Sequence, residues 1–171
     1  MELYILRHAI AVARGSVGFQ DDSQRPLTDE GEKKMARIAQ GMLALGFSLD
    51  AIYSSPFVRA RQTAEIVADA FKAHEKLVFT PHLQVDGSPE SLLKLVDKVH
   101  GPEASLMLVG HEPYLGSLIS ILIAGTDELS ITLKKGGLCK LTASKLRYGR
   151  CASLEWLLTP RVLASPRAHG R

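Results

Sequence analysis

The chain has 171 residues, of which 46% are hydrophobic, 23% are charged and 6% are aromatic, and its net charge is +3. These totals are typical of one soluble globular domain that is large enough to bury a core. The basic residues are spread out and the aromatic content is low, so nucleic-acid binding is not favoured. The two cysteines, Cys139 and Cys151, have no metal-like spacing and argue against a disulfide scaffold.

No segment predicts export or membrane insertion. Arg7 and His8 interrupt the N-terminal apolar run too early for a signal peptide. The longest apolar stretch, Leu115–Gly125, is too short to span a bilayer and predicts a buried helix. We therefore expect a cytoplasmic protein with no membrane partner.

Strand-like and helix-like runs alternate in the first half of the chain. Glu2–Leu6 is the first predicted strand, and a polar loop with glycines follows it. Thr28 is expected to cap a helix whose apolar residues keep helical spacing until Gly46. Asp50–Tyr53 is the second predicted strand, and Ser55 is expected to cap the helix after it.

The same alternation continues through the second half. The predicted elements there are, in chain order, a strand at Leu77–Thr80, a helix at Ser88–Val99, a strand at Ser105–Val109, an apolar helix opened by Pro113, and strands at Leu138–Thr142 and Ser153–Leu158. This pattern predicts an α/β fold, a three-layer α/β/α sandwich with a mainly parallel central sheet. It does not give the strand order. We expect residues 1–161 to form a single domain and residues 162–171 to be a loose C-terminal tail.

Polar residues follow three of the predicted strands at the point where each strand ends. Arg7 and His8 follow the first strand, Ser54 and Ser55 the second, and His111 comes after the strand at 105–109. In open α/β sheets, ligands bind in the crevice at the carboxyl ends of the strands. We therefore expect His8 and His111, a hundred residues apart in sequence, to meet in space.

Arg59 belongs to the same group, because it lies one turn into a predicted helix and helical side chains lean back toward the N-terminus. Two arginines beside two histidines favour a phosphate site, since guanidinium groups bind phosphate bidentately. A metal ion is disfavoured, because each close pair of positive charges costs about 4 kcal/mol at intermediate dielectric. In such a pocket a neutral imidazole is a competent nucleophile toward phosphorus.

Several segments resemble the histidine phosphatase superfamily, which has the phosphoglycerate mutase-like fold, and within it the small SixA-type phosphohistidine phosphatases. The resemblance covers essentially the chain to residue 161. Its motifs are ILRHA at Ile5–Ala9, RPLT at Arg25–Thr28, SSPFVRARQTA at Ser54–Ala64, VGHEPYL at Val109–Leu115, LKKGG at Leu133–Gly137 and LLTPR at Leu157–Arg161. Many members have glycine where this chain has Ala9, although the small branch tolerates alanine there.

The resemblance implies that His8 accepts the phosphoryl group and that Arg7, Arg59 and His111 complete the pocket. It implies a phosphatase without cofactor or metal. Larger relatives carry a carboxylic acid that protonates the leaving oxygen, and Asp86 is the candidate here, since Glu90 belongs to the first turn of a helix.

The scarcity of such acids favours a phosphohistidine substrate. An alkyl phosphate expels an alkoxide and needs an acid, whereas a phosphohistidine with its other ring nitrogen protonated expels neutral imidazole. The short connection after the strand at 77–80 leaves little room for a lid, and an open pocket suits a phosphate displayed on a protein, such as a histidine-containing phosphotransfer domain. The sequence thus predicts a phosphohistidine phosphatase in two-component signalling.

Two other functions stay open. One is a small-molecule phosphomonoesterase on the same fold, which a working Asp86 would favour, and the other is a non-catalytic phosphate-binding module. The roles of four basic residues, the physiological substrate and the oligomeric state are not predicted. The four residues, which could line the rim or be surface residues, are Arg14, Arg25, Lys134 and Lys135.

Overall fold

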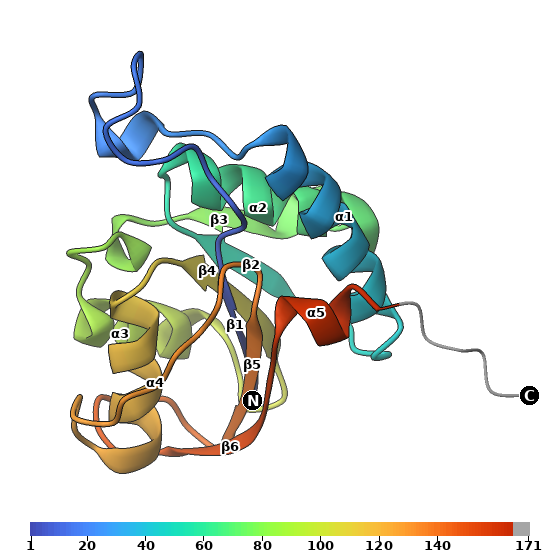
Figure 1. The fold of residues 1–171 in the computed structure, drawn as a ribbon. Helices are drawn as coiled ribbons and strands as arrows, with labels where there is room; N and C mark the ends of the chain where they lie inside the picture. The colour runs from blue at the N-terminus through green and yellow to red at the C-terminus, as the bar shows by residue number, and fades with distance from the viewer. Residues whose placement is uncertain (166–171) are drawn as a thin grey trace, which may run out of the picture.

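The computed structural model describes residues 1–165, which form a sheet covered by helices on both faces (Figure 1). The strands are β1 (Glu2–Arg7), β2 (Ala51–Ser54), β3 (Leu77–Phe79), β4 (Ser105–Gly110), β5 (Leu138–Ala143) and β6 (Ala152–Leu158). The helices are α1 (Asp29–Leu43), α2 (Val58–Phe71), α3 (Pro89–Val99), α4 (Tyr114–Ala124) and α5 (Pro160–Leu163), with short 3-10 helices η1 (Asp22–Gln24), η2 (His74–Lys76) and η3 (Pro81–Leu83).

The strand order is β3-β2-β4-β1-β5-β6. The pairs β2–β3, β2–β4 and β1–β4 are parallel, whereas β5 runs antiparallel to both β1 and β6. The sheet is therefore mixed and mainly parallel, which confirms the predicted fold class. Because β1, β2 and β4 lie side by side and point the same way, their carboxyl ends meet at one edge of the sheet.

The two faces of the sheet bury two separate apolar clusters. Along β1, Leu3 and Ile5 pack in the cluster that contains α3 and α4, and Tyr4 and Leu6 pack in the cluster that contains α1 and α2. This alternation follows from the two-residue period of a strand. It makes β1 the centre of the molecule and gives its last residues a rigid support.

The helix after β2 begins later than predicted. Ser55 still pairs with the sheet, since its backbone N–H donates to the carbonyl of Val109 at 3.0 Å. Its hydroxyl accepts from the N–H of Phe57 at 3.3 Å, and α2 begins only at Val58. Ser55 therefore supports a turn at the end of β2 and does not cap the helix, which leaves its side chain facing the carboxyl edge.

Val162 and Leu163, which were expected to belong to a loose C-terminal tail, lie in a helix. Pro160–Leu163 forms α5, and Leu163 is buried against α1. A side chain at Gly41 would collide with the carbonyl of Leu163, so the close approach requires a glycine in α1. Apolar burial thus orders the chain through Leu163. Residues 166–171 of the predicted tail lie outside the described residues.

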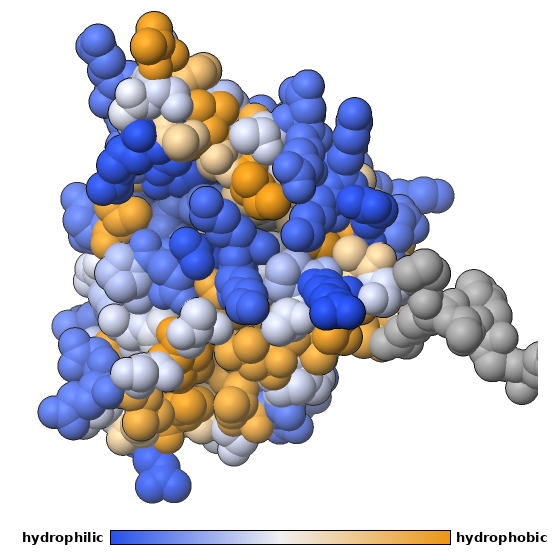
Figure 2. All heavy atoms as spheres, viewed as in Figure 1, coloured by the Kyte–Doolittle hydropathy of each residue, from blue (hydrophilic) through white to orange (hydrophobic). Residues whose placement is uncertain are grey.

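Hydrophilic residues gather across the middle of the molecule in Figure 2, and hydrophobic residues are more frequent below them, over α4 and β6. Helix α4 is the most apolar of the helices and has 11 residues. In residues 1–165 no helix has the length and apolar character needed to cross a membrane.

Candidate active site

A cavity of about 390 Å³ lies at the carboxyl edge of the sheet. Its lining residues come from the ends of β1 and β4, the loop before α1, the start of α2, the turn between η3 and α3, and the segment before β5. They are Arg7, His8, Ala11, Val12, Ala13, Arg14, Arg25, Arg59, Val85, His111, Glu112 and Lys135. All four residues expected to form the phosphate pocket are among them.

His8 and His111 meet as expected. Arg7 pairs with Gly110 across β1 and β4, so the residues that follow each strand lie next to each other. The two imidazole rings are 5.1 Å apart between centroids, and the backbone N–H of His8 donates to the carbonyl of Gly110 at 3.0 Å. Parallel pairing of β1 with β4 therefore places the two histidines side by side.

His8 is held as a neutral imidazole with one free nitrogen. Its ring is 6% exposed, and its Nδ1 lies 2.7 Å from the carbonyl oxygen of Ala9. A carbonyl can only accept, so Nδ1 carries the proton and the lone pair is on Nε2. Burial lowers the pKa of His8 well below its usual value, and the charges of Arg59 and Arg7 lower it further. His8 thus has the protonation state of a nucleophile.

His111 is buried more deeply than His8. Its Nε2 lies 2.8 Å from the hydroxyl of Ser55, which also accepts from the N–H of Phe57. We assign the Ser55 proton to this bond, which places the proton of His111 on Nδ1, a buried nitrogen that has no partner among residues 1–165. Burial, together with the charge of Arg59, lowers the pKa of His111 to about 3. His111 is therefore a neutral donor at the cavity.

The two arginines are anchored at one side of the guanidinium and free at another. Nη1 of Arg7 donates to the carbonyl of Leu133 at 2.9 Å, and its Nε is buried without a partner. Arg59 is only 2% exposed, and its Nη1 and Nη2 donate to the carbonyl and the carboxylate of Asp22 at 2.6 and 2.9 Å. Its Nε also lacks a partner.

The unpartnered atoms identify the chemistry of the cavity. Among residues 1–165, four buried side-chain nitrogen and oxygen atoms have no hydrogen-bond partner, and three of them are Arg7 Nε, Arg59 Nε and His111 Nδ1. A buried donor without a partner costs about 1–3 kcal/mol. An anion with several oxygen acceptors satisfies all three at once, so the cavity has the donor set of a phosphate site.

Four residues support the site, and the sequence analysis expected only Ser55 at this edge of the sheet, without its contact to His111. Thr63 accepts from the N–H of Ala9 at 3.0 Å and donates to the carbonyl of Arg59 at 2.7 Å, which ties β1 to α2. Glu112 accepts from the N–H groups of Gly116 and Leu133, both at 3.0 Å. Ser55 and Asp22 contact His111 and Arg59 directly. Ser55, Thr63 and Glu112 lie within the quoted motifs, which is their sequence signal, whereas Asp22 lies outside them.

The structure does not bring Asp86 into the cavity. Asp86 is exposed in the turn between η3 and α3, and the neighbouring Val85 lines the cavity in its place. Within the described part of the lining, Glu112 is the carboxylate, and both of its oxygens accept backbone N–H groups. Asp86 therefore does not lie at the cavity as a proton donor in this structure, and Val85 is its neighbour there.

The basic residues left open by the sequence separate into two groups. Arg14, Arg25 and Lys135 line the cavity, whereas Lys134 is exposed and is absent from the described lining. The turn that carries Lys135 is held on β1, since the N–H of Gly136 donates to the carbonyl of Arg7 at 3.0 Å. Gly136 has a φ of +76°, and a Cβ there would lie 2.8 Å from a methyl carbon of Ile38, so this turn requires glycine.

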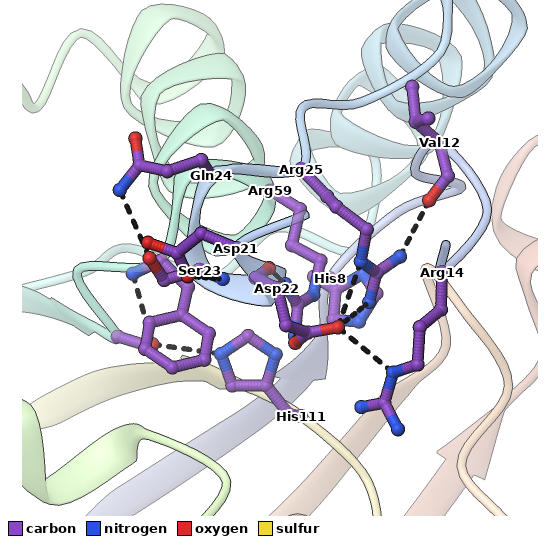
Figure 3. Close-up of polar contacts among 12 residues, drawn as sticks. His8, Val12, Arg14, Asp21, Asp22, Ser23, Gln24, Arg25, Arg59 and His111 are labelled. Carbon is purple, nitrogen blue, oxygen red and sulfur yellow. Dashed lines mark hydrogen bonds and ion pairs between the residues drawn. The ribbon is translucent and has the colours of Figure 1, made fainter. Parts of the chain in front are cut away.

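The loop between β1 and α1 covers one side of the cavity and bears three of the charged residues (Figure 3). Asp22 pairs with Arg14, Arg25 and Arg59 at 3.0, 2.8 and 2.9 Å. Burial raises the pKa of the Asp22 carboxyl, but the hydrogen bonds from Arg14 and Arg25 and the charge of Arg59 outweigh it and hold this pKa at about 2. The sequence analysis considered only the connection after β3, where it expected little room for a lid, and did not foresee the covering segment from residues 10–28.

No group of three or more His, Cys, Asp or Glu side chains in residues 1–165 is arranged to hold a metal ion.

Comparison with known proteins supports the assignment of the motifs. The sequence model of the Histidine phosphatase superfamily (branch 1) matches residues 3–84. An uncharacterised protein from Picosynechococcus sp. is 38% identical over 148 residues, which cover 86% of this chain and 88% of that protein.

Phosphohistidine phosphatase SixA from Escherichia coli is 27% identical over 169 residues, which cover 98% of this chain and 99% of SixA. The solved structure of the protein histidine phosphatase SixA complexed with tungstate has a TM-score of 0.80 at 23% identity, covering 95% of this chain and 99% of that chain. Motifs, fold and relatives agree, and the chain belongs to the histidine phosphatase superfamily.

Proposed function

We propose that the protein is a metal-independent phosphatase that removes the phosphoryl group from phosphohistidine on a signalling protein. The observation that carries this proposal is the neutral His8, whose Nε2 lone pair is free beside the unpartnered donors of Arg7, Arg59 and His111. The name of the Escherichia coli relative, a phosphohistidine phosphatase, supports the choice of substrate.

The reaction has two steps. In the first, His8 Nε2 forms a bond to phosphorus while the bond from phosphorus to the substrate imidazole breaks, and its electron pair stays on the substrate nitrogen. In the second, water attacks the phosphorus of the phosphorylated His8, the bond to Nε2 breaks, and the water proton leaves with phosphate or to solvent. Arg7, Arg59 and His111 stabilise the three non-bridging oxygens in both transition states.

The position of the carboxylates favours phosphohistidine over aliphatic phosphomonoesters. Asp86 is exposed and does not line the cavity, and both oxygens of Glu112 are engaged by backbone N–H groups. A leaving alkoxide needs a proton donor, whereas a leaving neutral imidazole does not. Similar kcat/KM values on phosphohistidine and on phosphoserine-type substrates would contradict this preference.

The test is to incubate the purified protein, in the presence of EDTA, with a histidine-phosphorylated phosphotransfer domain and to follow the label. We expect rapid loss of label with the wild type and none with His8→Ala. His74→Ala is the matched control, since His74 is an exposed histidine remote from the cavity lining, and it should behave as wild type. Retention of the label by the wild type would contradict the proposal. Release by His8→Ala would contradict the covalent step.

A further inference from the structure

We propose that Asp22 is an intramolecular competitor for phosphate, whose carboxylate occupies the terminal nitrogens of Arg59 until phosphate displaces it. The proposal rests on the proposed function insofar as it takes the cavity as the phosphate site. It assigns to the loop before α1 the role of setting the affinity of the site for substrate and product phosphate.

Asp22 occupies the two terminal nitrogens of Arg59. Nη1 donates to the backbone carbonyl of Asp22 at 2.6 Å and Nη2 to its Oδ2 at 2.9 Å. These two nitrogens form one of the two edges through which a guanidinium can bind a phosphate bidentately, and Nε with Nη2 forms the other. Asp22 therefore holds the terminal edge of Arg59, while the buried Nε has no partner among residues 1–165.

The Asp22 carboxylate is negatively charged, and phosphate bound to Arg59 would lie close to it. Asp22 is ionised at all ordinary pH values, because the arginines around it hold its pKa at about 2. Figure 3 shows its side chain directed toward the arginines from the loop that covers His8 and His111. A phosphate dianion that binds Arg59 through its unpartnered Nε would lie next to this carboxylate, and like charges at close range repel strongly in a partly buried site.

The loop can move Asp22 away from Arg59 without disturbing the fold. Its base is closed by the bridge between Ala11 and Leu27 and by the N–H of Val12, which donates to the carbonyl of Pro26 at 2.9 Å. Its tip is open to solvent, since Val17 is fully exposed and the Arg14 side chain is 79% exposed. Movement of Asp22 away from Arg59 therefore needs only the segment between these two ends to shift.

A purely orienting role for Asp22 makes the opposite prediction. If Asp22 only positioned Arg59 for phosphate, loss of its charge would weaken phosphate binding. If Asp22 competes, loss of its charge strengthens phosphate binding, because the fraction of sites with Arg59 available rises. The sign of the change separates the two roles.

The experiment measures the Kd of inorganic phosphate by calorimetry for the full chain, its Asp22→Asn variant and its Asp21→Asn variant. Asp21 is the matched control, since its carboxylate accepts from the N–H of Ser23 and Asn is an equally good cap. We expect Asp22→Asn to bind phosphate about tenfold more tightly. This factor corresponds to a wild type in which Asp22 is bonded to Arg59 about nine tenths of the time. Asp21→Asn should bind as wild type. Weaker binding by Asp22→Asn, or the same change in both variants, would overturn the proposal.

A second measurement does not depend on the variant. Hydrogen exchange of wild-type amides in residues 13–24 should become faster when phosphate is added, because Asp22 is released, while exchange at His8 should not. Slower exchange in the loop would overturn the proposal. Neither measurement requires turnover. If Asp22→Asn binds phosphate more tightly than the wild type as expected, but the wild type leaves phosphohistidine intact, the result would contradict the proposed function alone.

Discussion

The molecule has a cavity at each end of its sheet, and the two differ in how their polar groups are satisfied. The cavity at the amino ends of β1 and β4 measures about 580 Å³, and the one at the carboxyl ends about 390 Å³. In the larger cavity Lys140 pairs with Glu2 at 2.5 Å, and the hydroxyl of Tyr4 donates to the same carboxylate at 2.8 Å. In the smaller cavity three buried donors have no partner. Unsatisfied polar groups, and not volume, distinguish the candidate active site.

The largest expected effect is at Arg59. Arg59→Lys replaces a planar guanidinium with a single ammonium, and we expect kcat/KM on a phosphohistidine substrate to fall about 100-fold, or roughly 2.7 kcal/mol. Steady-state kinetics checks this. Arg61→Lys is the matched control on the same helix, since Arg61 is about half exposed and pairs only with Glu65 at 3.8 Å among its described contacts. An equal loss in the two variants would show that the cavity does not carry the activity.

The two buried histidines predict a second effect, on stability against pH. Their pKa values in the folded protein lie below the ordinary value of 6.5, so below that pH the unfolded chain binds more protons than the folded one. The free energy of unfolding should therefore fall as pH falls from 6.5, by up to about 1.4 kcal/mol per pH unit for each histidine. Stability held by the lowered pKa of Asp22 is lost only below its ordinary value of 3.8.

Denaturant unfolding between pH 6.5 and 4.5 isolates the histidines from Asp22. His111→Asn should remove about half of the slope, and His74→Asn, at an exposed site, should leave it unchanged. A free energy of unfolding that does not vary over this interval would show that both imidazoles are protonated in the folded protein. The nucleophile argument for His8 would then fail.

How far the sequence predicted the site follows the same division between strand ends and loops. His8, His111 and Arg7 were placed correctly because parallel strands bring their carboxyl ends together, and this geometry is a general property of the fold. The contacts of Asp22 were not predicted, because they depend on how a loop of irregular structure folds over the cavity. The position of Asp86 was not predicted for the same reason, since it lies in an irregular turn in which the neighbouring Val85 lines the cavity.

Thr63 is a smaller test, because it acts on His8 through the backbone of Ala9. Thr63→Val keeps the shape but leaves the N–H of Ala9 without its acceptor, which should lower the free energy of unfolding by about 2 kcal/mol. We expect kcat to fall more than KM rises, because the Thr63 hydroxyl holds the backbone of Ala9 and so positions the nucleophile His8. Thr63→Ser keeps the hydroxyl and should restore kcat. A stable Thr63→Val protein with wild-type kcat would contradict this positioning role.

The smallest effect is expected in the opposite cavity. The Lys140–Glu2 pair is partly exposed, with side-chain exposures of 19% and 40%, and pairs of this kind contribute about 0–1 kcal/mol. Lys140→Met keeps the packing over the ring of Tyr4, so the free energy of unfolding should change by less than about 1 kcal/mol and kcat/KM should not change. Denaturant unfolding gives the free energy and steady-state kinetics gives kcat/KM, both on the same preparation of Lys140→Met. A tenfold loss of kcat/KM in Lys140→Met would contradict the comparison between the two cavities. It would show that the cavity at the amino ends of the strands, whose charges are paired with each other, affects the reaction at the carboxyl ends.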